Sequence, residues 1–179
     1  MRIYLVRHAE KESEGENPNL TKKGIKQAKL LARKLKKIKF TKFYCSNLNR
    51  AIETAEIVSK EIKLKLIHEN CLREFESTYR IFKRDKNRWK KEELMQYKKL
   101  ISFIDKLTKD KTKESNILII AHGLVNRVIM AHLLKMPLKK FIIFKQEETC
   151  ANIFYWVERY GNWRLEKMND NSHVPERLK

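Results

Sequence analysis

With 179 residues, 42% of them hydrophobic, the chain is long and apolar enough to fold as one domain over residues 1–179, which excludes a disordered protein. No apolar run reaches the roughly 20 residues of a membrane-spanning helix, and three widely spaced cysteines argue against a disulfide framework or a zinc site. We therefore expect a cytoplasmic protein. Its net charge of +19 favours anionic partners without choosing between a phosphorylated metabolite, an acidic protein and nucleic acid.

The apolar periods alternate between strand and helix, which predicts an α/β domain with a mostly parallel sheet. In chain order, strands are expected at 2–7, 43–45, 64–67, 116–121, 151–157 and 163–165. Helices are expected at 25–38, with Thr21 as N-cap, and at 48–62, 94–107 and 125–134. The charged stretch 76–91 predicts an irregular excursion, and the polar tail from Asn169 predicts loose order.

Chemically capable side chains follow the predicted strands. Ligands of open parallel sheets bind outside the carboxyl ends of the strands, so these residues are expected to converge. The set consists of Arg7 and His8 after the first strand, Ser46 and Arg50 after the second, Glu74 after the third and His122 after the fourth.

Two arginines beside an imidazole predict a phosphoryl-binding site, because guanidinium groups bind phosphate oxygens in pairs. The same positive charges keep His8 neutral, with a lone pair for attack on phosphorus. A bound phosphate raises the pKa of Glu74, which fits a general acid for the leaving oxygen. His122 is expected to stabilise the transition state together with Arg7 and Arg50.

Several segments together resemble the histidine phosphatase superfamily, the group that includes cofactor-dependent phosphoglycerate mutases and many small phosphatases. They occur in the family's order and the resemblance spans residues 2 to about 157. The matching segments are 5–10 (LVRHAE), 20–24 (LTKKG), 27–28 (QA), 44–51 (YCSNLNRA), 54–55 (TA), 72–75 (LREF) and 121–123 (AHG).

The resemblance implies a three-layer α/β/α sandwich, a phosphohistidine intermediate at His8, and no metal or other cofactor. It implies phosphate clamping by Arg7, Arg50 and His122, and Gly123 is carried over with its motif. Residues 149–152 resemble the family's final strand motif only loosely, which extends the expected substrate-binding set to Thr149 and Cys150.

The chain departs from the family after the acidic residue, where 76–80 reads ESTYR in place of a Trp-Glu-Gly run. We therefore expect a small lid or cap near 76–98 that sets specificity. Arg80, Lys83, Arg84, Arg88 and Lys90 there either hold a second anionic group or are ordinary surface charge.

Structural roles compete with some of these assignments. Arg50 is also compatible with a solvated ion pair to Glu53, Glu74 with a surface charge, and Ser46 with a helix cap instead of a phosphate ligand. The lysines of 22–39 are read as a solvated helix face. Without stacking aromatics or a binding motif, they predict no specific nucleic-acid partner. The sequence leaves the oligomeric state undecided.

The favoured function is hydrolysis of small phosphate monoesters. One alternative is a phosphomutase, although the chain is short for holding both ends of a substrate. Another is a protein phosphohistidine phosphatase, against which Glu74 argues, because such a leaving group needs less help from an acid. A metal site at His8 and His122 is disfavoured by the adjacent arginines. A binding protein without catalysis stays open.

Overall fold

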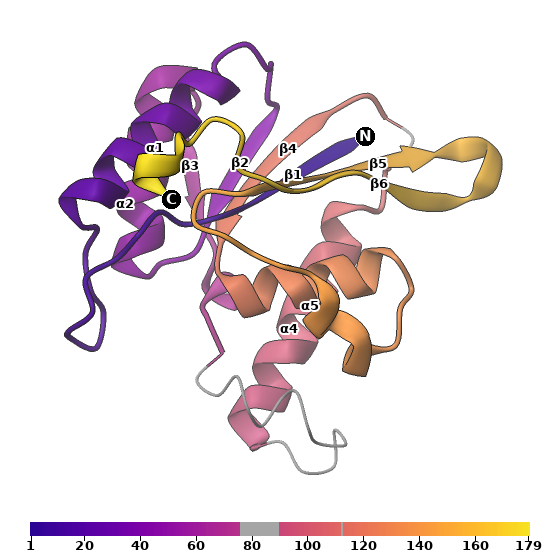
Figure 1. The fold of residues 1–179 in the computed structure, drawn as a ribbon. Helices are drawn as coiled ribbons and strands as arrows, with labels where there is room; N and C mark the ends of the chain where they lie inside the picture. The colour runs from indigo at the N-terminus through magenta and orange to yellow at the C-terminus, as the bar shows by residue number, and fades with distance from the viewer. Residues whose placement is uncertain (76–89, 112) are drawn as a thin grey trace.

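The computed structural model describes residues 1–75, 90–111 and 113–179, and its centre is a six-stranded sheet of order β3-β2-β4-β1-β5-β6 (Figure 1). The strands are β1 (Arg2–Arg7), β2 (Lys42–Cys45), β3 (Leu66–His68), β4 (Asn116–Ala121), β5 (Ala151–Val157) and β6 (Asn162–Asp170). The main helices are α1 (Lys22–Leu35), α2 (Asn49–Ile62), α4 (Lys91–Leu107) and α5 (Gly123–Leu133). Short 3-10 helices are η1 (Asn70–Leu72), η3 (Leu138–Ile143), η4 (Glu158–Tyr160) and η5 (Glu176–Leu178).

Four strands of the sheet are parallel: β1 pairs with β4, β4 with β2 and β2 with β3. The antiparallel hairpin of β5 and β6 completes the sheet beside β1. Its connection ends at Gly161, which has a φ of +59°, a backbone conformation that glycine adopts at little cost. The predicted α/β fold with a mostly parallel sheet is therefore confirmed.

Helices cover both faces of the sheet, as Figure 1 shows with α1 and α2 on one side and α4 and α5 on the other. Alternate residues of β1 face opposite cores: Ile3 and Leu5 pack with α4 and α5, whereas Tyr4 and Val6 pack with α1 and α2. A strand buried on both faces explains the continuous apolar runs in the sequence.

The start of α1 fits the predicted cap, because the Thr21 hydroxyl accepts a hydrogen bond from Gly24 N at 2.8 Å. Gly24 is required there by close approach: a Cβ atom at this position would lie 2.0 Å from the carbonyl oxygen of Glu10. The helix is thus pressed against the segment that follows His8.

Two predictions are corrected. The tail from Asn169 is ordered, since β6 extends to Asp170, Val174 is buried, and Gln27 Nε2 donates to Leu178 O at 2.8 Å. The third strand begins at Leu66 instead of Leu64.

The expected lid near 76–98 falls largely on 76–89, which lie outside the described residues, and from Lys91 the chain is helical. Over the part of the chain that the structure describes, no helix combines the length and apolar character needed to cross a membrane.

Candidate active site

The carboxyl ends of β1, β2 and β4 lie side by side and bring the predicted site residues together. The parallel ladder continues one residue past each strand: His8 N donates to Ala121 O at 3.0 Å, and Ser46 N donates to Ile120 O at 3.1 Å. His8, Ser46 and His122 therefore each follow directly after one of three neighbouring strands, with His8 level with His122 and Ser46 level with Ala121. The convergence expected from the sequence is present in the structure.

His8 is held with one ring nitrogen occupied and the other facing a cation. Its Nδ1 lies 2.7 Å from Ala9 O, a carbonyl that only accepts, so Nδ1 carries the proton. Nε2 accepts a 3.2 Å hydrogen bond from Arg50 Nε. Burial, together with Arg7 and Arg50, lowers the pKa of His8 to about 3, against the opposing effect of Ala9 O. His8 is consequently neutral at physiological pH.

Arg50 is buried on α2 and does not form the alternative pair with Glu53, whose carboxylate accepts from Leu20 N at 2.8 Å. Thr54 supports it one turn later: its hydroxyl donates to Arg50 O at 2.6 Å and accepts from Ala9 N at 3.1 Å. Thr54 belongs to the matching segment 54–55, which indicated no role for it. It ties the helix of Arg50 to the segment of His8.

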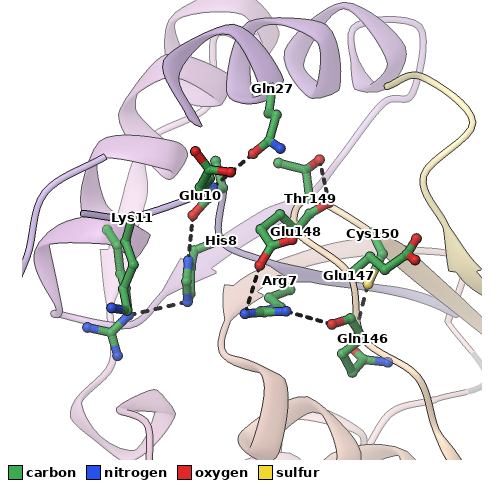
Figure 2. Close-up of polar contacts among 12 residues, drawn as sticks. Arg7, His8, Glu10, Lys11, Gln27, Gln146, Glu147, Glu148, Thr149 and Cys150 are labelled. Atoms are coloured by element: carbon green, nitrogen blue, oxygen red, sulfur yellow. Dashed lines mark hydrogen bonds and ion pairs between the residues drawn. The ribbon is translucent and has the colours of Figure 1, made fainter. Parts of the chain in front are cut away.

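Arg7 reaches across to the segment that precedes β5 (Figure 2). Its Nη1 donates to Gln146 O at 2.6 Å and its Nη2 lies 3.0 Å from a carboxylate oxygen of Glu148, while its buried Nε has no partner among the described residues. Gly123 lies against this guanidinium, since a Cβ there would be 3.7 Å from Arg7 Nε. No motif in the sequence pointed to Glu148, which brings negative charge to the expected phosphate clamp.

His122 faces His8, with ring centroids 5.0 Å apart and planes inclined by 59°. Its Nε2 lies 2.8 Å from Ser46 Oγ, and its buried Nδ1 has no partner in the described part of the chain. Burial and then the positive charges of Arg50 and Arg7 place the pKa of His122 well below the usual histidine value. It is a neutral imidazole beside the predicted nucleophile His8.

Glu74 is held at the N-terminus of α5 and is not a free surface charge. One carboxylate oxygen, Oε2, accepts from Leu124 N at 3.2 Å, and the other, Oε1, accepts from Val125 N at 3.2 Å and from Phe75 N at 3.3 Å. These bonds favour the charged form, yet burial raises the pKa of Glu74 above the ordinary value. Oε2 makes fewer bonds and is therefore the oxygen with room for a proton.

Thr149 and Cys150 border the site through their backbones. Thr149 N donates to His8 O at 3.2 Å, and Arg7 N donates to Cys150 O at 3.2 Å. The Thr149 hydroxyl donates to Glu148 O at 2.7 Å, and the Cys150 thiol lies 3.7 Å from an oxygen of Gln146. Both side chains are fully buried. Their predicted contact with substrate stays a prediction.

The remaining histidines each have a partner away from His8. His68 lies 3.5 Å from the Cys45 thiol, and His132 lies 2.7 Å from a carboxylate oxygen of Asp105 on the surface. His173, in the tail, lies 3.2 Å from the Thr149 hydroxyl, whose own proton is committed to Glu148 O. Their structural interpretation is consistent with these contacts.

The fold and site define an α/β protein with two neutral, buried histidines near two arginines at the carboxyl edge of the sheet. The chain belongs to the histidine phosphatase superfamily, branch 1, whose family model matches residues 3–171. The predicted family membership is thereby confirmed.

Among curated relatives, the serine/threonine-protein phosphatase Pgam5 of Drosophila ananassae is 28% identical over 188 residues, covering 97% of this chain and 64% of the fly protein. Phosphoserine phosphatase 1 of Hydrogenobacter thermophilus is 24% identical over 204 residues, covering 98% of this chain and 95% of its own length. The chain thus spans about two thirds of the first relative and nearly all of the second. The alpha-ribazole phosphatase of Shigella flexneri shares the fold with a TM-score of 0.75 at 23% identity, with 96% and 97% of the two chains covered.

Proposed function

We propose that the protein hydrolyses small phosphate monoesters through a phosphohistidine formed on Nε2 of His8. The observation that carries the proposal is the state of that imidazole. Ala9 O holds the proton on Nδ1, and the lone pair on Nε2 faces Arg50 at 3.2 Å. An unprotonated nitrogen beside phosphate-binding cations is the arrangement that nucleophilic attack on phosphorus requires.

In the first step the Nε2 lone pair of His8 forms a bond to phosphorus, and the bond from phosphorus to the ester oxygen breaks. The departing oxygen takes the proton of Glu74, which leaves as part of the alcohol. Arg7, Arg50 and His122 stabilise the charge on the equatorial oxygens. The raised pKa of Glu74 supports this role, because the carboxyl group must hold a proton when the bond from phosphorus to the ester oxygen breaks.

In the second step water attacks the phosphorus of phosphohistidine. Glu74, now a carboxylate, accepts one proton of this water, and the bond between phosphorus and Nε2 breaks. Inorganic phosphate leaves, and both His8 and Glu74 return to their starting states.

The substrate class follows from the acid and from the relatives. Glu74 favours an ester with a poor leaving group over a phosphohistidine, whose leaving group needs less protonation. Two of the similar proteins are named for small phosphate esters, phosphoserine and alpha-ribazole phosphate. The fly relative is named for phosphorylated serine and threonine in proteins, so phosphopeptides form a necessary arm of the test.

The test is a panel of small phosphate esters and phosphopeptides, followed by rapid quenching in base and a search for acid-labile phosphate on the protein. We expect turnover of small esters and phosphate on His8, and neither in His8→Ala. His132→Ala is the matched control, since that histidine pairs with Asp105 on the surface and should leave turnover unchanged. Normal turnover by His8→Ala would exclude the mechanism, and faster turnover of phosphopeptides would exclude the substrate class.

A further inference from the structure

Ser46 contacts His122 across two neighbouring strand ends. Ser46 follows β2, His122 follows β4, and these parallel strands are paired up to Cys45 and Ile120. The Ser46 hydroxyl oxygen lies 2.8 Å from His122 Nε2, and both side chains are fully buried. The contact is therefore shielded from water.

This hydrogen bond can run in either direction, because the Ser46 hydroxyl can donate one proton and accept two. Ser46 Oγ already accepts from Leu48 N at 3.3 Å, and its own proton has one ring nitrogen within reach. A neutral imidazole carries a single N–H. If the hydroxyl donates to Nε2, the imidazole proton resides on Nδ1, the nitrogen for which the described residues supply no partner.

A phosphoryl group bound at His8 favours the same position of the His122 proton. A phosphoryl group bound at His8 presents only acceptor oxygens, and the two rings are 5.0 Å apart between centroids. A lone pair on Nδ1 would repel those oxygens, whereas an N–H would donate to them.

We propose that Ser46 is a positioning residue that fixes His122 as the Nδ1–H tautomer, so that His122 donates to the transferring phosphoryl group. The proposal rests on the proposed function. It also replaces the prediction that the Ser46 hydroxyl binds phosphate, because that hydroxyl is committed to Leu48 N and His122 Nε2.

The tautomer can be read directly by nitrogen NMR of histidine-labelled protein without substrate, with the His122 signals assigned by their loss in His122→Gln. We expect Nδ1–H in the wild type. In Ser46→Ala the ring should revert towards Nε2–H, the form that a histidine side chain favours in water. Ser59→Ala is the matched control, because Ser59 donates to Leu64 O at the far end of α2. An Nε2–H wild type, or no change in Ser46→Ala, would overturn the proposal.

Kinetics separate positioning from phosphate binding. Loss of a correctly aimed donor should lower kcat of Ser46→Ala roughly 10- to 100-fold with little change in KM or in inhibition by inorganic phosphate. Ser46→Thr, which keeps the hydroxyl, should restore the tautomer if thermal melting shows that it folds. A raised KM with unchanged kcat would instead make Ser46 a phosphate ligand. Since the NMR result needs no turnover, an inactive wild type would refute the proposed function and leave the tautomer assignment standing.

Discussion

The ends of β1 and β4 carry the same side chain in adjacent, parallel positions, yet they present it differently. His8 and His122 are both buried and both have lowered pKa values. At His8 the backbone carbonyl of Ala9 occupies Nδ1, and Nε2 faces Arg50. At His122, Nε2 lies 2.8 Å from the hydroxyl of Ser46 instead, and Nδ1 has no partner among the described residues. The partners of the ring nitrogens thus differ between the two histidines, and this difference is what separates the proposed nucleophile from the proposed donor.

Removing Arg50 should have the largest effect on the His8 side. Arg50→Ala removes a phosphate-binding cation and the N–H that faces Nε2, so we expect kcat/KM to fall by about 1000-fold. Arg50→Lys should recover only part of this loss, because lysine lacks a planar pair of donors. Steady-state kinetics on a small ester measures both. Arg33→Ala, on the exposed face of α1, is the control for lost positive charge. A similar loss in both variants would mean that the total charge matters instead of the contact.

Glu74→Gln tests the acid, which contacts the helix of His122 instead of His8. We expect about a 100-fold loss on an alkyl phosphate and a small loss on an activated phenyl phosphate. The amide also weakens the hydrogen bonds of this side chain to the start of α5, so the loss of activity on the phenyl ester measures any general damage to the site. Equal losses on both esters would remove the acid role.

The pH profile sharpens the same assignment. Because burial raises the pKa of Glu74, the acid stays protonated to a higher pH than an ordinary glutamate, and kcat/KM for the alkyl ester should fall as pH rises through that pKa. His8, with a pKa of about 3, stays deprotonated from pH 6.5 down to near that value, so its titration should not limit activity in this range. In Glu74→Gln the alkaline fall should disappear. If the alkaline fall persists in Glu74→Gln, it is caused by the titration of another group.

Glu148→Gln removes the negative charge beside Arg7. A partly exposed pair of this kind contributes about 1 kcal/mol, so phosphate should bind roughly 5-fold more tightly once it no longer competes with the carboxylate. Inhibition by inorganic phosphate measures the change. Glu166→Gln is the matched control, because Glu166 pairs with Arg2 at the opposite end of β1. Weaker phosphate binding in Glu148→Gln would show that Glu148 instead holds Arg7 in its binding position.

The sequence was sufficient for the strands and helices that meet at the site. The period of β1 and β4 and the capping of α1 by Thr21 depend on neighbouring residues, and the strand-end rule then placed His8 beside His122. The strand-end rule does not predict which ring nitrogen of each histidine carries the proton. Which nitrogen of His122 is occupied depends on Ser46, 76 residues away, for which the sequence left open a phosphate contact or a cap of the following helix.

Glu148, which contacts Arg7 from the C-terminal part of the chain, was missed for a related reason. It lies in a segment without apolar period, and its place is set by its ion pair with Arg7. The tail was expected to be loose because it is polar. It is ordered by scattered contacts, such as Val174 in the core and His173 on Thr149, that no local pattern records.

The smallest expected effect tests whether the tail stabilises the segment of His8 without affecting His122. Gln27 accepts from Glu10 N at 2.9 Å and donates to Leu178 O, linking the segment after His8 to the tail. Gln27→Ala leaves both backbone groups unpaired, so the free energy of unfolding should fall by about 2 kcal/mol, with a 2- to 3-fold loss of kcat. Denaturant unfolding and kinetics measure the two effects.

Gln27→Glu separates the two bonds, because a carboxylate keeps the acceptor for Glu10 N and loses the donor to Leu178 O. If the tail supports His8, this variant should also lose stability and part of kcat. The NMR tautomer of His122 should be unaffected in both variants, because His122 leads directly into α5, where Asn126 N bonds its carbonyl at 2.9 Å. A changed His122 tautomer would show that the two strand ends are coupled through the tail, and their separate control by Ala9 and Ser46 would then be refuted.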